Sequence, residues 1–192
     1  MNEVELRGRI IGINKQPKHS HFTLATTTNG YRAFPRVYVF DLNQKADFDK
    51  QHNIGDMVTV KARIQTAKKR PTTIVAYEIT PTKRVFEEDF GVKKGVFESD
   101  VNEVKLKGAL THVYMPPASS VKLALATVRT VDAGGRTNFP VVTLFGQDAT
   151  NAAAMNADAE ICFIGRVQTH RSTKDGITKE YESYVGSVAK AP

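Results

Sequence analysis

Aromatic side chains and one arginine alternate with valines in the stretch Phe34-Pro35-Arg36-Val37-Tyr38-Val39-Phe40. Side chains of a β-strand alternate between its two faces, so Val37 and Val39 share one face and the rings share the other with Arg36. Flat rings stack on bases and a cation contacts phosphates, so this face suits a single strand of nucleic acid. The alternative is that both faces are buried and the rings fill a barrel. Arg36 favours exposure, because an unpaired arginine is rarely fully buried.

The same pattern returns later in the chain as Phe139-Pro140-Val141-Val142-Thr143-Leu144-Phe145. A second repeat matches Asn2-x-Val4-x-Leu6-x-Gly8 with Asn102-x-Val104-x-Leu106-x-Gly108 and marks the start of each copy. The chain is therefore expected to contain two domains, residues 1–84 and 101–192. Residues 85–100 form an acidic linker with three phenylalanines. Its rings pack on one barrel, or the segment mimics nucleic acid in a basic groove.

Composition favours an anionic partner. The 192 residues carry a net charge of +7, and the excess is concentrated in residues 1–84. The first half is therefore expected to bind more electrostatically than the second. The one cysteine, Cys162, excludes an intrachain disulfide and fits a reducing compartment. No apolar stretch is long enough to span a bilayer, so we expect a cytoplasmic protein with no membrane partner.

Groups that could catalyse a reaction are scattered. His19 and His21 have a spacing that could ligate a metal, but solvated loop histidines are more common. Asp47 and Asp49 lack a companion cluster, and no phosphate-binding glycine loop with its lysine is present. We therefore expect a binding protein that is not an enzyme and uses no cofactor or metal.

The order of elements in each half predicts the fold. Each half contains three strands, a short helix and two more strands, with the Phe-Pro stretch as the third strand. The helices are expected at residues 43–51 and 148–155. In this reading Leu24-Ala25-Thr26 corresponds to Leu125-Ala126-Thr127. This order predicts an all-β protein with short helices, built as two tandem five-stranded OB-fold barrels, whose second and third strands bind oligonucleotides.

The second half resembles the bacterial and phage single-stranded DNA-binding protein family. The resemblance rests on the Asn102 to Gly108 pattern, Leu125-Ala126-Thr127, Val141 to Gly146 and Gly165-Arg166-Val167-Gln168-Thr169. It implies base stacking on Phe139 and Phe145 and, through the repeat, on Phe34 and Phe40. Val131 and Ser172 occupy about the positions of strong family tryptophans, and the acidic, phenylalanine-tipped tail of the family is replaced by a short basic end.

Basic residues accompany the ring-bearing strands and are expected on the same surface. The full set of expected nucleic-acid contacts is Tyr31, Arg32, Phe34, Arg36, Tyr38, Phe40, Lys61, Arg63, Lys68, Lys69, Arg70, Arg136, Phe139, Phe145, Arg166, His170, Arg171 and Lys174. As a group they are expected to contact phosphates, with binding that weakens steeply as salt rises.

The sequence therefore predicts a protein that coats single-stranded DNA during replication, recombination or repair. A homodimer would present four OB folds, as in the usual assembly of the family. Two alternatives stay open. The same fold binds single-stranded RNA, and nothing here reads the 2′-hydroxyl. One degenerate barrel could instead serve as a protein-interaction scaffold.

Overall fold

The computed structural model describes residues 1–68, 70–82, 84–89, 92–97, 99–117, 121–174 and 177–191. Two of the expected contacts fall outside this description: Lys69 altogether, and the side chain of Lys174. No helix in the described part of the chain has the length and apolar character needed to cross a membrane.

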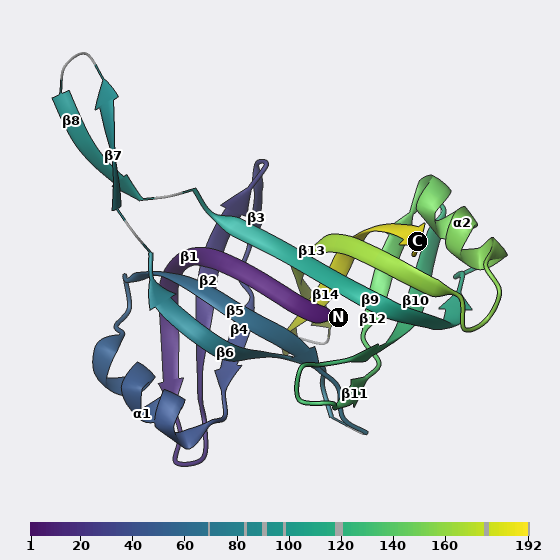
Figure 1. The fold of residues 1–192 in the computed structure, drawn as a ribbon, viewed down its shortest axis with the longest axis horizontal. Helices are drawn as coiled ribbons and strands as arrows, with labels where there is room; N and C mark the ends of the chain where they lie inside the picture. The colour runs from purple at the N-terminus through teal and green to yellow at the C-terminus, as the bar shows by residue number, and fades with distance from the viewer. Residues whose placement is uncertain are drawn as a thin grey trace. The chain divides into compact units, whose positions relative to one another are not determined.

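The first half forms a closed barrel of five main strands (Figure 1). Its strands run in the spatial order β1-β2-β4-β6-β5, and β5 pairs back with β1 to close the barrel. The short strand β3 extends the edge beside β2. The elements are β1 Asn2–Lys15, β2 Ser20–Thr28, β3 Tyr31–Ala33, β4 Arg36–Val39, α1 Leu42–Gln51, β5 Met57–Gln65 and β6 Thr73–Pro81.

Apolar residues at alternate positions build the core of this barrel. Val4, Leu6 and Ile10 of β1 are buried, as their spacing predicts. Helix α1 begins where the Asp41 carboxylate accepts a hydrogen bond from the Gln44 backbone N–H at 2.9 Å. Its buried Phe48 stacks on Phe22 of β2 with ring centroids 4.7 Å apart. The helix therefore completes the core.

The second half repeats the topology. Its strands run β10-β12-β14-β13-β9, and a further pairing between β9 and β10 closes the barrel. Strands β12 and β14 are parallel, whereas β10 is antiparallel to both β12 and β9. The elements are β9 Val101–Tyr114, β10 Leu123–Val131, β11 Thr137–Asn138, β12 Val141–Phe145, α2 Gly146–Ala154, β13 Glu160–Lys174 and β14 Ile177–Lys190.

Both barrels therefore have the strand order, and the helix between the third and fourth main strands, that the sequence predicts for OB folds. The all-β fold class with short helices is confirmed. Helices lie at Leu42–Gln51 and Gly146–Ala154, within a few residues of the expected ranges.

The segment between the halves contains a hairpin. Strands β7 (Arg84–Asp89) and β8 (Val92–Phe97) pair antiparallel, with Arg84 opposite Phe97 and Asp89 opposite Val92. The side chains of this hairpin lie outside the described part of the structure. Both interpretations of its phenylalanines, packing on one barrel and mimicry of nucleic acid, therefore stay predictions.

The expected match between the two Leu-Ala-Thr motifs is wrong. Leu24 of β2 is fully buried, whereas Leu125 of β10 is only half-buried and Ala126 faces the core. In the structure Ala25 and Arg129 are the equivalent residues, because the carbonyl oxygen of each approaches the corresponding β1 or β9 glycine, Gly8 or Gly108. A shift by an odd number of residues exchanges the two faces of a strand, so the same motif places its leucine in the core of one barrel and on the outer face of the other.

Packing divides the chain into two compact units that exchange segments. The C-terminal unit comprises Met1–Val4, Arg63–Ile74 and Glu103–Pro192, and the N-terminal unit comprises Glu5–Ala62 and Val75–Asn102. In the C-terminal unit, the backbones of Met1 and Lys107 exchange two hydrogen bonds. The division into residues 1–84, 85–100 and 101–192 stays a prediction.

Candidate nucleic-acid interface

The third main strand of the first barrel, β4, presents rings on its outer face. Val37 and Val39 are fully buried, whereas Phe34 is 46% and Phe40 43% exposed. Arg36 is exposed and Tyr38 is half-buried on the same outer face. The alternation predicted from the sequence is thus present, and the alternative in which these rings fill the barrel is wrong.

Two histidines join these rings into a larger surface. Strand β2 pairs with β4 so that His21 lies opposite Tyr38, with ring centroids 5.2 Å apart. His19 lies 5.5 Å from Phe40 and 6.0 Å from His21. Tyr38 and Phe40 stack nearly parallel, at 5.7 Å and 11°. We refer to His19, His21, Tyr38 and Phe40 as the ring cluster.

The two histidines are not among the expected contacts, because their spacing favours solvated loop residues. Strand β2 starts at Ser20, which places His21 within the strand and His19 beside its first residue. The period-two pattern contains the signal, because a buried Phe22 implies an outward His21. Partial burial, the positive charge of Arg36 and that of His19 hold the pKa of His21 below its ordinary value.

Tyr31 and Arg32 extend from the same region on a tight hairpin. Strand β3 pairs with β2 through Thr28 and Tyr31, and the two residues between them, Asn29 and Gly30, both have positive φ. An Asn-Gly pair in this conformation is the favoured two-residue hairpin turn. Tyr31 is 57% exposed at the hairpin end and Arg32 is also exposed.

The corresponding face of the second barrel carries fewer rings. Phe139 and Phe145 are 47% and 45% exposed, and Val142 and Leu144 are fully buried. Between the phenylalanines, however, the outer face of β12 carries Val141 and Thr143. Thr143 pairs with Leu125 of β10, at the positions that Tyr38 and His21 occupy in the first barrel. The second face is therefore largely aliphatic.

The first-half cations differ in their surroundings. Lys61 is paired with Glu78 on the neighbouring strand, with Nζ 3.0 Å from a carboxylate oxygen and both side chains about half exposed. Lys68 and Arg70 are exposed, and neither forms an ion pair with another described residue. Of these three residues, only Lys68 and Arg70 present uncompensated charge. That Lys61, Lys68 and Arg70 contact phosphates stays a prediction.

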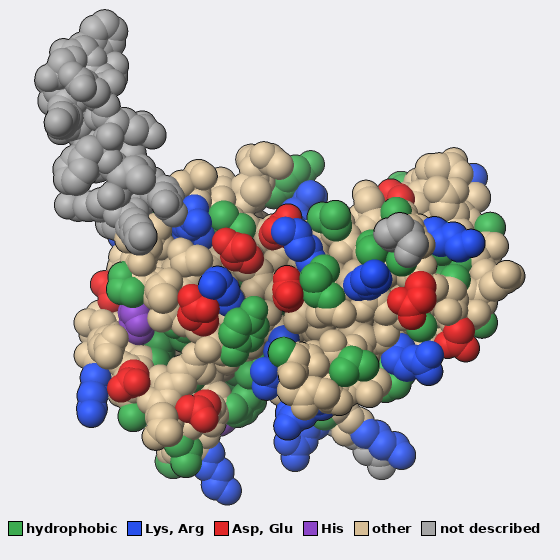
Figure 2. Space-filling view, in the orientation of Figure 1, with side chains coloured by type: hydrophobic (Ala, Val, Ile, Leu, Met, Phe, Trp, Pro, Cys, Tyr) green, Lys and Arg blue, Asp and Glu red, His purple; other side chains and the backbone are tan. Residues whose placement is uncertain are grey.

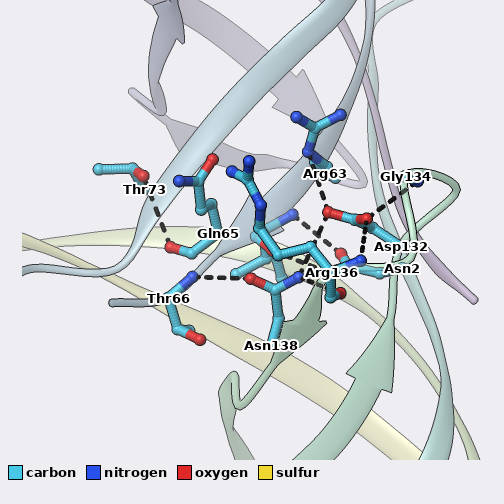
Figure 3. A network of polar contacts seen from close by, with 10 residues as sticks. Asn2, Arg63, Gln65, Thr66, Thr73, Asp132, Gly134, Arg136 and Asn138 are labelled. Atoms are coloured by element: carbon cyan, nitrogen blue, oxygen red, sulfur yellow. Dashed lines mark hydrogen bonds and ion pairs between the residues drawn. The ribbon is translucent and has the colours of Figure 1, made fainter. Parts of the chain in front are cut away.

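Arg63 belongs to a polar network inside the C-terminal unit (Figure 3). Its Nε lies 3.2 Å from a carboxylate oxygen of the nearly buried Asp132. Asp132 also accepts hydrogen bonds from the backbone N–H groups of Gly134 and Arg136, each at 3.0 Å. Although burial opposes its ionisation, the Arg136 N–H, the Arg63 charge and the Gly134 N–H together hold the pKa of Asp132 below its ordinary value. This ion pair fixes the loop before β11.

Most of the remaining second-half residues lie on the long hairpin of β13 and β14. His170 stacks on Tyr181 with centroids 5.2 Å apart, and its Nε2 lies 2.7 Å from the Ser183 hydroxyl. Arg171 forms an exposed ion pair with Glu180 at 2.6 Å. Tyr181, which pairs with His170 on this hairpin and is 54% exposed, is not among the contacts expected from the sequence. Arg166 is half-buried on β13, and Arg136 is exposed in the loop before β11.

The net charge does not form one uniform patch. The face in Figure 2 interleaves Lys and Arg side chains with Asp and Glu. Residues 63–74 carry four cations and no carboxylate and pack in the C-terminal unit. With this segment and Glu3 added to the +2 of residues 103–192, the C-terminal unit has net charge +5, which leaves +2 for the N-terminal unit. The expectation that the first half binds more electrostatically does not follow once packing is considered.

No group of three histidine, cysteine or acidic side chains in the described residues is arranged to hold a metal ion. His19 and His21 pack against aromatic rings instead. Within the described ranges, the chemistry that this surface offers is ring stacking and cation contact.

Comparison with solved structures agrees with this architecture. The chain is similar to the wild-type single-stranded DNA binding protein from Thermus aquaticus, with a TM-score of 0.68 and 17% identity, over 100% of this chain and 93% of that one. A deletion mutant of the same protein gives a TM-score of 0.66 and 17% identity, over 100% of this chain and 95% of that one. No protein-family model matches, and the search of curated proteins gave no match. At this identity the likeness establishes the fold, across both halves of the chain.

Proposed function

We propose that this protein binds single-stranded DNA on the outer faces of its barrels with little sequence preference. The observation that carries the proposal is the ring cluster, which lies with Arg36 on the outer face of the second and third main strands of an OB fold. Strands two and three are the surface that this fold uses for oligonucleotides. The likeness to a single-stranded DNA binding protein over the whole chain supports the same function.

Stacking explains the lack of sequence preference. Every base has a flat face, and one base stacked on an aromatic side chain contributes about 1–3 kcal/mol. Phe34, Tyr38 and Phe40 supply such faces in the first barrel, and Phe139 and Phe145 in the second. In a duplex the bases are already stacked on one another, so the rings select single strands. Arginines and lysines nearby contact the phosphates.

The proposal is tested by fluorescence anisotropy with labelled oligo(dT) and a duplex of equal length, at low and moderate salt. We expect wild type to prefer the single strand, and Phe34→Ala/Phe40→Ala to lose affinity at both salt concentrations. Equal binding to both DNA forms, lost with salt and unchanged in the double variant, would identify a general polyanion binder and reject the stacking mechanism. A matched oligo(rU) distinguishes DNA from RNA preference.

The cellular role that follows from this activity is protection of exposed single strands in replication, recombination or repair. Two barrels in one chain supply half of a four-barrel assembly, so we propose a homodimer that presents four OB folds. Light scattering of the full chain tests it. A mass equal to one chain across the working concentration range rejects the dimer but not DNA binding.

A second candidate function concerns the second barrel alone. Its outer face exposes Val141, Phe139 and Phe145 beside Leu125. An exposed apolar face of this kind also suits a protein partner. Unchanged DNA affinity in a Phe139→Ala/Phe145→Ala variant would favour this interaction role over DNA contact.

A further inference from the structure

The segment Arg63–Ile74 belongs by sequence to the first half but packs with the second half in the C-terminal unit. Asn2 fixes its start, because the Asn2 side chain donates to the Ile64 carbonyl at 2.7 Å and accepts from the Ile64 N–H at 2.9 Å. Both Asn2 and Ile64 are buried. The base of this segment is therefore held in place, and the exposed residues that follow it are tethered.

The same segment contacts the residues just before the second ring-bearing strand, β12, and Figure 3 shows its contact with Asn138. The Thr66 N–H donates to the Asn138 side-chain oxygen at 3.0 Å, and the Phe139 N–H donates to Thr66 Oγ1 at 2.8 Å. Asn138 is fully buried, and its amide nitrogen donates to the Arg136 carbonyl at 3.1 Å. Thr66 thus fixes the backbone of Phe139 from one side while its ring stays 47% exposed.

Exposed cations lie close in sequence to Thr66 and Phe139. Lys68 and Arg70 follow Thr66 by two and four residues, both exposed, and a backbone hydrogen bond from Arg70 to Ala67 closes the turn that carries them. Arg136 is exposed three residues before Phe139. Asp132, the carboxylate nearest in sequence to Phe139, is already paired with Arg63. The region therefore combines an exposed ring with uncompensated cations.

From these contacts we infer that the second binding face is composite: a base stacked on Phe139 has its flanking phosphates held by Lys68 and Arg70 of the first half. The inference rests on the proposed single-strand binding and specifies its contacts. It also explains how a largely aliphatic face with few charges of its own binds a polyanion. Thr66 is the positioning residue, because it holds the backbone of Phe139 against the segment that carries the two cations.

A double-mutant cycle on the full chain tests the assignment. Affinity for labelled oligo(dT) is measured for wild type, Phe139→Ala, Lys68→Ala/Arg70→Ala and the combined variant. We expect the loss of both cations to weaken binding about tenfold in wild type, and to lower the salt slope by about 1.4, since each phosphate contact on a single strand contributes about 0.7. In the Phe139→Ala background, Lys68→Ala/Arg70→Ala is expected to weaken binding only about twofold, because without the ring the DNA strand no longer binds beside the two cations.

The matched control replaces Phe139→Ala with Phe40→Ala, whose ring lies in the N-terminal unit. The fold-losses in affinity caused by Phe40→Ala and by Lys68→Ala/Arg70→Ala are expected to multiply in the combined variant, because the two sites act independently. Losses that multiply with Phe139→Ala overturn the composite face, while the proposed function stands as long as wild type prefers single-stranded DNA. Absence of such binding by wild type rejects the proposed function itself.

A second set of variants tests positioning without any change of charge. Thr66→Val removes the acceptor of the Phe139 N–H, and Thr66→Ser keeps it. We expect Thr66→Val to weaken binding a few-fold in wild type but not in Phe139→Ala, and Thr66→Ser to restore wild-type affinity. Equal losses for both substitutions, or a loss that persists without the Phe139 ring, overturn the positioning role.

Discussion

His21 is a residue of the ring cluster whose pKa lies below its ordinary value. In the free protein, burial of the ring, Arg36 and His19 hold its pKa below 6.5, so the neutral form is favoured. A bound phosphate brings negative charge to the same surface and favours the imidazolium. When the pKa of a group is higher in the complex than in the free protein, binding takes up protons and affinity rises as pH falls.

We therefore expect affinity for oligo(dT) at constant salt to rise more between pH 7.5 and 5.5 in wild type than in His21→Phe. The phenylalanine keeps a ring at this position but cannot titrate, which makes it the matched control. Titrations by anisotropy at several pH values supply the comparison. Identical pH slopes for the two proteins would place bound phosphates away from His21.

Asp132 links the acid stability of the protein to the Arg63 network. Its pKa is depressed below 3.8 in the folded state, so its ionised form stabilises the fold above that pH, and this contribution is lost as pH falls through the lower folded pKa. Asp132→Ala also removes the ion-pair partner of Arg63 and the acceptor of the Gly134 and Arg136 backbone N–H groups. We expect it to reduce the free energy of unfolding by about 2–4 kcal/mol at neutral pH, measured by urea denaturation.

Asp158→Asn is the control for this carboxylate, because asparagine removes the charge and tolerates the positive φ of 61° at this residue. Asp158 forms an exposed ion pair with Arg129 at 3.2 Å, and such surface pairs contribute about 0–1 kcal/mol. Equal destabilisation by the two substitutions at neutral pH would show that burial of Asp132 adds nothing to its interactions.

At the scale of elements, the two barrels use the same device to bring their first two strands together. A Cβ atom added to Gly8 of β1 would lie 2.3 Å from the Ala25 carbonyl oxygen, and one added to Gly108 of β9 would lie 2.1 Å from that of Arg129. Both obstacles are backbone atoms of the next strand, so a side chain at either glycine forces the strands apart.

Gly8→Ala and Gly108→Ala are each expected to lower the free energy of unfolding by about 2–3 kcal/mol, as overpacked sites typically do. Gly12→Ala is the matched control on β1, because its added Cβ meets no atom within 4 Å. Thermal or urea denaturation of the three variants decides the point. Comparable stability of Gly8→Ala and Gly12→Ala would mean that the strands separate at little cost.

The sequence predicted these elements because the repeated polar-apolar alternation is local. Strand order, helix positions and the outward rings of β4 and β12 follow from that alternation. The equivalence of the two second strands did not follow, because the hydrogen-bond register is set by the closing glycines and not by the Leu-Ala-Thr letters. The partners of Arg63 and Thr66 lie about seventy residues away, in a loop whose position only tertiary packing determines.

At the scale of the whole molecule, the exchange of segments between the units redistributes function as well as charge. The N-terminal unit carries the ring cluster but little net charge, whereas the C-terminal unit carries few rings and the basic segment Arg63–Ile74. Binding through the first face should therefore depend mainly on stacking, and binding through the second mainly on phosphate contacts. Stacking depends less on salt than counterion release does.

Exchanging the residues that distinguish the two faces tests this division directly. His21→Leu/Tyr38→Thr gives the first barrel the residues of the second, and Leu125→His/Thr143→Tyr makes the reverse change at positions paired in the same way. We expect the first pair to weaken oligo(dT) binding about tenfold or more, and the second pair to strengthen it, since each stacked base contributes about 1–3 kcal/mol.

All four positions lie on outer faces and are only half-buried, so circular dichroism should show that each variant retains its fold. A loss in the first pair with a gain in the second means that ring content, not position in the chain, determines the strength of each face. A loss in the first pair without a gain in the second means that the second strand pair does not contact bases. Its exposed Val141 and half-buried Leu125 would then be better explained by a protein partner, and the single strand would depend on the first barrel alone.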